Sequence, residues 1–382
     1  MTPKLSISQE NNRNKLILIG NGFDLAHGLK TSYADFLFWY LQNIIDGLNN
    51  AEPNGKYNPK CNYKDDVIEV ERPDSKTHIT IESIKDFIDL IASGKITINN
   101  NDGDKSFLEY LIELSEGQRW VDIEYEYFLW LTKIYDKYFV RNNIVRKLEK
   151  LNKEFAYIQR NLEIYIDFKY KQFLEKIIDD RRSPRITNII NQINNTAQIK
   201  TLYFLNFNYT NTIDDYINGK NNILNNVFSS KNKNQITVSN IHGSVFDNKN
   251  PIIFGYGDDM SEYYKKLEDK NIDQLTQNFK TFHYLKTRNY KGLSNFINSG
   301  NYDVYILGHS CGVSDRALLN MIFENEKCNS IQIFHYKKAN GQTDFLEKTQ
   351  GISRCISQNN YKINFMDKVV PYNEDDWMSK AE

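Results

Sequence analysis

The hydrophobic pattern divides the chain into two kinds of segment. Short continuous apolar runs lie at residues 16–19, 201–207, 236–241, 302–307 and 330–335. Runs of this kind are typical of strands that are covered on both faces of a parallel sheet. Between the first and second runs, apolar residues recur at three- and four-residue spacing, which predicts helices at residues 107–114, 128–138 and 144–178. Residues 144–178 are long enough for an antiparallel pair of helices.

The order of these segments predicts an α/β fold. We expect a Rossmann-like parallel sheet flanked by helices, with a large, mainly helical insertion after the first strand-helix unit. The predicted α/β core comprises residues 1–40 and 196–382, and the predicted insertion comprises residues 41–195. Residues 52–60 and 99–104 are polar and turn-prone, and are therefore interpreted as surface loops.

Composition narrows the class of protein. The 48 Lys and Arg residues nearly balance 49 Asp and Glu residues, so no overall field attracts the chain to nucleic acid or to an anionic membrane. Four scattered cysteines without a C-x-x-C pair indicate neither a metal site nor a disulfide framework. The polar N-terminus and the absence of an apolar run of about 18 residues predict a soluble cytoplasmic protein without a membrane span.

A glycine turn follows the first apolar run directly. Gly20, Gly22 and Gly28 stand between residues 16–19 and a helical segment. The first glycine permits a tight turn, the second lets a ligand approach the backbone, and the N–H groups of the next helix attract an anion. This turn predicts a nucleotide-phosphate site. The alternative is an ordinary strand-to-helix turn with Asp24 as the N-cap.

Three further motifs stand at the ends of predicted strands. They are residues 206–212, the sequence His242-Gly243-Ser244, and residues 308–315. Because the carboxyl ends of parallel strands meet at one edge of a sheet, where open α/β sheets bind their ligands, we expect these motifs to share one site.

The sequences of these motifs resemble those of the phage abortive infection AbiH family. The resemblance rests on residues 18–28, 120–124, 206–212, 254–258 and 307–310, and on the His242-Gly243 pair. These motifs span most of the chain. The resemblance implies a bacterial protein that acts in abortive infection, and it is less informative about the reaction.

AbiH proteins in turn resemble the sirtuin-like NAD-binding domains of antiviral defence. The glycine spacing in residues 20–28 is similar, Asn208 matches the first residue of an Asn-Tyr-Asp motif, and Gly308-x-Ser310 matches a Gly-Thr-Ser that contacts NAD. Thr210 replaces the aspartate of that motif, and the four zinc cysteines of sirtuin deacetylases have no counterpart. The resemblance therefore implies NAD as substrate or ligand, without a metal and without deacetylase activity.

The enzyme that this resemblance implies is an NAD glycohydrolase, which cleaves the nicotinamide glycosidic bond through an oxocarbenium-like transition state. Asn208 would hold the ribose or the attacking water. A neutral His242 would accept a proton, because an unperturbed histidine pKa of about 6.5 lies near cytoplasmic pH. The residues expected to bind NAD are Gly20, Asn21, Gly22, Phe23, Asp24, Gly28, Asn206, Gly308, Ser310 and Asp315.

Each candidate also has a purely structural interpretation. Asn208 would bridge loop backbone groups, and His242 would be a hydrogen-bonded histidine at a strand end. Asp315 is equally suited to cap the next helix, and Trp120 to anchor packing. A solvated helix face is the simple interpretation of the acidic residues Asp122, Glu124 and Glu126.

Three other functions remain open. Residues 308–312 fit a G-x-S-x-G nucleophile elbow with Ser310 as the nucleophile of a serine hydrolase, but the later histidine, His335, is only one strand away. A non-catalytic sensor of a nucleotide or a phage component would use the same pocket. A toxin directed at nucleic acid is disfavoured by the neutral charge. The expected partners are a nucleotide, a phage-derived trigger and a second copy of the chain.

Overall fold

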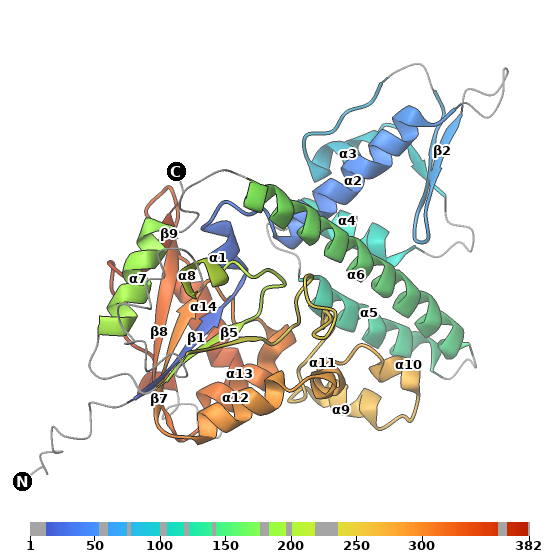
Figure 1. Cartoon of the computed structure of the whole chain (residues 1–382). Coiled ribbons are helices and arrows are strands. Elements are labelled where there is room, and N and C mark those ends of the chain that lie inside the picture. The colour runs from blue at the N-terminus through green and yellow to red at the C-terminus, as the bar shows by residue number, and fades with distance from the viewer. Residues whose placement is uncertain are drawn as a thin grey trace, which may run out of the picture.

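The computed structural model describes residues 13–52, 60–74, 78–99, 105–117, 122–139, 143–175, 183–195, 201–217, 236–357 and 365–380. Figure 1 shows the arrangement of the helices and strands. In chain order the elements are β1 (Asn14–Ile19), α1 (Asn21–Leu25), α2 (Tyr33–Asn50), β2 (Cys61–Lys64), β3 (Glu69–Arg72), α3 (Ile84–Ala92), β4 (Thr97–Ile98), α4 (Phe107–Gly117), α5 (Ile123–Tyr138), α6 (Ile144–Glu175), α7 (Pro184–Asn195), β5 (Leu202–Asn206), α8 (Asp214–Ile217), β6 (Ile236–Asn240), α9 (Glu262–Glu268), α10 (Asp273–Thr276), α11 (Lys280–His283), the 3₁₀ helix η3 (Tyr284–Lys286), α12 (Asn289–Asn298), β7 (Tyr302–Leu307), the 3₁₀ helix η4 (Val313–Asp315), α13 (Arg316–Phe323), β8 (Cys328–Lys337), α14 (Phe345–Cys355) and β9 (Trp377–Lys380).

The main sheet of the described chain has six parallel strands in the order β6-β5-β1-β7-β8-β9. Numbered along the chain, these strands read 3-2-1-4-5-6, which is the order of doubly wound Rossmann folds. The direction of winding reverses between β1 and β7, so the carboxyl ends of these two strands border the switch point. Helices flank the sheet (Figure 1), and the predicted Rossmann-like α/β fold is confirmed.

Strand β1 shows why continuous apolar runs predicted the sheet. Leu16 and Leu18 pack in one core cluster with α12, α13 and α14. Ile17 and Ile19 pack in another with α1, α7 and α8. Side chains alternate across a strand, and here both faces are covered by helices. Consequently each of these four positions is buried and apolar.

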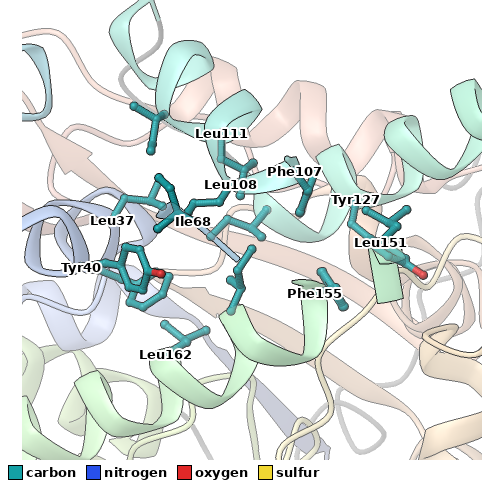
Figure 2. Close-up of a cluster of buried hydrophobic side chains, with 14 of the residues drawn as sticks. Leu37, Tyr40, Ile68, Phe107, Leu108, Leu111, Tyr127, Leu151, Phe155 and Leu162 are labelled. Atoms are coloured by element: carbon teal, nitrogen blue, oxygen red, sulfur yellow. The ribbon is translucent and has the colours of Figure 1, made fainter. Parts of the chain in front are cut away.

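A separate core fills the helical region between α2 and α6. Figure 2 shows part of this cluster. Leu37 and Tyr40 come from α2, and Ile68 directly precedes β3. The other labelled side chains come from α4, α5 and α6. The chain after β6 joins the same cluster. Phe254 stacks on Phe155 with ring centroids 4.6 Å apart, and Tyr256 stacks on Phe128 at 3.9 Å. The helical region therefore packs against the segment that leads back to the sheet.

Some predicted elements differ from the structure. Residues 144–175 form one continuous helix of 32 residues, α6, so the prediction of an antiparallel pair is wrong. No glycine or proline interrupts this stretch.

The three-stranded antiparallel sheet β2-β3-β4 was not predicted, because its strands have two to four residues and no continuous apolar run. Most of the two predicted surface loops, and Trp120, lie outside the described residues.

The division into core and insertion stays a prediction. Helix α2 runs without a break across the proposed limit at residue 40, and α7, which falls within 41–195, packs on the sheet. No described helix combines the length and apolar composition that are needed to cross a bilayer.

Candidate functional site at the switch point of the sheet

The glycine turn after β1 packs directly against the end of β7. The amide of Gly20 donates to the carbonyl of Leu307 at 3.1 Å, and that of Gly22 donates to the carbonyl of Gly308 at 2.9 Å. A Cβ atom on Gly22 would lie 2.8 Å from the Cα of Gly308. The glycines thus permit close approach of two chain segments, and the Gly22 amide is already engaged. The phosphate-binding role of this turn stays a prediction.

Asp24 lies at the centre of a small buried polar group behind this turn. Its Oδ2 accepts a hydrogen bond from the Thr210 hydroxyl at 2.7 Å, and its Oδ1 has no hydrogen-bond partner among the described residues. Burial raises the pKa of Asp24 to about 6, although hydrogen bonds such as that from Thr210 lower it. Gly20, not Asp24, occupies the N-cap position of α1, so the N-cap interpretation of Asp24 is wrong.

Asn208 joins the same group through the backbone. Its side-chain amide donates to the carbonyl of Gly20 at 3.1 Å, and its own N–H donates to Oδ1 of Asn206 at 3.0 Å. The Asn206 amide in turn donates to the carbonyl of Thr210 and to Asn240. These contacts give both asparagines the loop-bridging geometry of the structural interpretation. No hydrogen bond joins Asn208 to His242 in the described part of the chain.

Four charged or titratable side chains meet in a second buried group at the same edge. The Nζ atom of Lys280 lies 2.7 Å from Oδ1 of Asp315 and 3.0 Å from Oε2 of Glu124. Nε2 of His242 lies 3.1 Å from the same Oδ1 of Asp315. Lys280 is fully buried, and the other three side chains are at most 11% exposed. We call these four residues the Lys280 cluster.

Mutual contact sets the protonation of the Lys280 cluster. Burial raises the pKa of Glu124 to about 8, although Lys280 opposes this shift. Glu124 is therefore the carboxyl group of the cluster that carries a proton at neutral pH. Burial alone would raise the pKa of Asp315 and lower that of Lys280, but each holds the other in its charged form. Burial, helped by Lys280, lowers the pKa of His242 to about 4. At neutral pH the cluster is therefore an ion pair with a neutral acid and a neutral imidazole.

The contacts also define which imidazole nitrogen carries the proton. An ionised Asp315 can only accept, so Nε2 of His242 is its donor, and the Nδ1 lone pair makes no hydrogen bond to a described residue. The hydroxyl of Tyr284 lies 3.1 Å from the same Nε2. At His309, Nδ1 accepts from the amide of Cys311, which leaves an Nε2–H facing Oδ2 of Asp315 at 3.5 Å.

Residues 254–258 connect this cluster to the rest of the molecule. The Gly255 amide donates to Oε1 of Glu124 at 2.8 Å, the amide of Lys280 donates to the carbonyl of Tyr256, and the amide of Gly257 donates to the carbonyl of Ser314. One short segment thus ties the start of α5, the start of α11 and the turn before α13. This explains the glycines of the Phe254-Gly255-Tyr256-Gly257-Asp258 motif, because a Cβ on Gly255 would meet the carbonyl oxygen of Asn278 at 2.0 Å.

Other predicted binding residues lie around these two groups. Asn21 accepts a hydrogen bond from Thr31, and the ring of Phe23, in α1, is buried in the core cluster that includes α7 and α8. Ser310 is exposed. Gly28 has a positive φ of 75° with open space around it, as the residue that ends the turn after α1. The structure thus brings His242 and Asp315 into contact, and it places Asn208 with the Asp24 group instead.

Sequence reasoning missed two members of the site and misjudged a third. Lys280 and Tyr284 lie outside the sequence motifs described above, and nothing in the local sequence pattern marks a lysine as buried. Glu124 and Glu126 are 5% and 8% exposed, so their interpretation as part of a solvated helix face is wrong. Asp122 does cap α5, because its side chain accepts hydrogen bonds from the amides of Glu124 and Tyr125. The position of Asp122 before Glu124 was the sequence signal that could have placed Glu124 at the start of a helix.

Two further alternatives were tested by the geometry. Asp315 does occupy the N-cap position of α13, but its side chain makes no cap hydrogen bond to that helix. Among the non-glycine residues of the 308–312 turn, Cys311, with φ 55°, and not Ser310, has a positive φ. Both ring nitrogens of His335 lack a hydrogen-bond partner among the described residues, so His335 makes no hydrogen bond to Ser310. A nucleophile elbow with its histidine is therefore not formed.

The fold and the site define an α/β protein of Rossmann-type strand order with buried polar residues at its switch point. A family model described as bacteriophage abortive infection AbiH matches residues 16–337. This match covers more than half of the chain, and the protein therefore belongs to the AbiH family of abortive infection proteins. The matched region includes the sheet from β1 to β8 and every residue of the Lys280 cluster. No curated protein matches the chain.

Proposed function

We propose that this AbiH protein interrupts phage infection by hydrolysing NAD at the bond between nicotinamide and ribose. The observation that supports this reaction best is the His242–Asp315 contact, 3.1 Å long, at the carboxyl edge of the sheet. Rossmann-type sheets bind nucleotides at this edge. A buried histidine oriented by a carboxylate is also a common arrangement for general base catalysis.

The reaction requires one water and no redox partner. The C1′–N bond of the nicotinamide riboside breaks, the water oxygen bonds to C1′, and one proton is released, which gives nicotinamide and ADP-ribose. Asp315 would hold His242 through Nε2–H, so that Nδ1 accepts a hydrogen bond from the water. A pKa of about 4 makes His242 a weak base. Because bond cleavage runs ahead of attack in an oxocarbenium-like transition state, positioning of the water is the larger requirement.

The surrounding residues have supporting roles in this proposal. Ser310, which is exposed in the turn after β7, is available to a ribose or phosphate. Asn208 supports the backbone of Gly20 and is assigned a positioning role. The ring of Tyr284 lies parallel to that of His242, with centroids 6.1 Å apart and an interplanar angle of 11°. Because His242 is 4% exposed, the substrate reaches it only when some of the side chains packed around it move aside.

The deciding experiment compares three proteins in cells through a phage infection that the wild type aborts: wild type, His242→Gln and His78→Gln. His78 is an exposed histidine far along the chain from the site and provides the matched control. We expect NAD to collapse with wild type and with H78Q, and to stay level with H242Q. Purified wild-type protein should release nicotinamide from NAD, and H242Q should do so at least about 100-fold more slowly, the usual contribution of a general base.

Urea unfolding of H242Q, measured beside the wild type, separates lost chemistry from lost folding. If H242Q is folded and still depletes NAD, His242 is not the base. If wild-type cells keep their NAD while they remain protected, the NAD hydrolase proposal is refuted.

A non-catalytic sensor is the second candidate, and the closed state of the site favours it. Lys280, Asp315 and Glu124 neutralise one another in a buried cluster that joins α5 to α11 and η4. A ligand that changes this contact would change how the helical region sits on the sheet. In that case, NAD or another nucleotide would bind to the purified protein and be recovered unchanged.

A further inference from the structure

A cavity lies in the helical region, at the other end of α5 from Glu124. Its volume is about 350 Å³, which is within the range of small-ligand sites. It is lined by residue 105 before α4, one face of α5 and one face of α6; the residues are Lys105, Trp130, Lys133, Ile134, Lys137, Tyr138, Lys147, Lys150, Leu151 and Glu154.

The spacing of the lining residues places them on two facing helix stripes. On α5 they stand at positions 130, 133, 134, 137 and 138, and on α6 at positions 147, 150, 151 and 154. Both sets follow the i, i+3, i+4, i+7 pattern of one helix face. Such stripes normally form an apolar contact. Here each stripe carries two lysines, and the apolar contact is confined to residues such as Ile134 and Leu151.

The charge of the cavity is strongly positive. Five of the ten lining residues are lysines, and the single acid is Glu154. Oε2 of Glu154 accepts a hydrogen bond from the amide of Phe107 at 2.7 Å, and its Oε1 lies 4.0 Å from Nζ of Lys150. Lys105 forms an ion pair with Glu113. Lys133 and Lys137 form no ion pair with any described residue. The protein as a whole has a net charge of −1, so this cavity concentrates positive charge that the overall composition does not explain.

Aromatic rings stand beside these lysines. Nζ of Lys133 lies 4.8 Å from the ring centroid of Tyr110 and 5.7 Å from that of Trp130, and Nζ of Lys137 lies 5.0 Å from that of Tyr138. Trp130 is partly exposed and packs on Tyr110, with centroids 4.7 Å apart. Cationic donors combined with aromatic surface match a ligand that carries both phosphate groups and a planar ring.

We propose that this cavity binds a nucleotide, with its phosphates on the lysines and its base beside Trp130 and Tyr138. The cavity has the size of one small ligand, and the rest of the chain offers no positive overall field. Both observations favour a mononucleotide over a nucleic-acid strand. The site is separate from the Lys280 cluster, and the inference does not depend on NAD hydrolysis.

Calorimetric titration of the full chain with ATP tests this site. We expect the double variant K133Q/K137Q to weaken ATP binding by about tenfold or more, because two charged phosphate contacts are lost. The control K85Q/K153Q removes the same charge from two exposed lysines, one of them on α6 but outside the cavity, and should bind ATP like wild type. H242Q should also bind ATP like wild type, which distinguishes this site from the switch point.

Three further ligands identify the chemistry that is recognised. Inorganic triphosphate should bind more weakly than ATP but with the same dependence on Lys133 and Lys137, and adenosine should bind weakest. Trp130→Phe should weaken ATP and leave triphosphate unchanged. The proposal is overturned if ATP does not bind at millimolar concentration, or if K133Q/K137Q and its control bind ATP equally. It is also overturned if a 20-nucleotide single strand binds through these lysines while ATP does not.

Discussion

At the scale of single residues, burial decides what the charged groups of this protein do. Lys280 has no solvent contact, and a buried charge is tolerated only when a partner compensates it. Asp315 supplies that partner at 2.7 Å, while Glu124 at 3.0 Å takes up a proton. His242 stays neutral beside them. The same environment therefore yields one ion pair, one neutral acid and one neutral imidazole.

Asp24 gives a residue-scale prediction about pH. Its folded pKa of about 6 lies above its ordinary value of 3.8, so the native state binds this proton more tightly than the unfolded state does. Its contribution to stability is fully present below pH 3.8 and is lost as the pH rises through 6. Asp24→Asn removes this loss. We expect D24N to exceed the wild type in free energy of unfolding by up to about 3 kcal/mol at pH 7.5, and by much less at pH 4.

Urea unfolding at several pH values measures this difference. Asp89→Asn, an exposed substitution of the same kind, should change stability by less than about 0.5 kcal/mol. A D24N difference that is the same at pH 4 and pH 7.5 would contradict the raised pKa.

At the scale of elements, the close approach of β1–α1 to the end of β7 explains the glycines of both motifs. A Cβ on Gly308 would lie 2.3 Å from the amide nitrogen of Phe23, and one on Gly22 would lie 2.8 Å from the Cα of Gly308. The two strand ends that form the switch point thus touch through backbone alone. A bulky residue at Gly22 therefore disturbs this packing, whether or not a ligand binds there.

Gly308 and Gly28 form a matched pair for this argument. Their φ angles are 78° and 75°, but only Gly28 has open space around it. Gly28→Ala should therefore cost about 1 kcal/mol of stability, the strain of the left-handed conformation alone. Gly308→Ala adds the backbone clash and should cost about 3 kcal/mol or more. Thermal or urea unfolding compares the two, and equal costs would show that the turn and β7 do not pack this closely in solution.

At the scale of the whole molecule, the helical region and the sheet share contacts that the chain order does not suggest. Phe254 and Tyr256, which follow β6, stack on residues of α6 and α5. Leu275 and Phe279 belong to the same core cluster. The Lys280 cluster adds a polar contact between the start of α5 and the sheet edge. The two predicted units are therefore joined by both apolar and ionic contacts.

This packing predicts the behaviour of a shortened chain. Joining residue 40 directly to residue 196 removes the rest of α2, the sheet β2-β3-β4 and α3 to α7. It leaves Phe254, Tyr256, Leu275 and Phe279 without their core, and it uncovers the face of the main sheet on which α7 packs. We expect the shortened chain to aggregate or to unfold without cooperativity, whereas the full chain elutes as a defined species. Size-exclusion chromatography and urea unfolding of both chains provide the comparison. A shortened chain that is soluble and unfolds cooperatively would instead support residues 1–40 and 196–382 as an independent domain.

The sequence by itself determined five strands of the main sheet, the helical character of α4, α5 and α6, and the family. Continuous apolar runs located β1, β5, β6, β7 and β8, because strands covered on both faces must be apolar throughout, and helical spacing located α4, α5 and α6. The strand-end motifs contained His242 and Asp315. Short polar strands such as β2 and β3 gave no such signal. The tertiary structure decided which polar residues meet: Glu124 and Lys280 are 156 positions apart, and Asp24 and Thr210 are 186 apart. Local periodicity reports only which face of an element is buried, whereas contact between distant elements depends on how those faces pack.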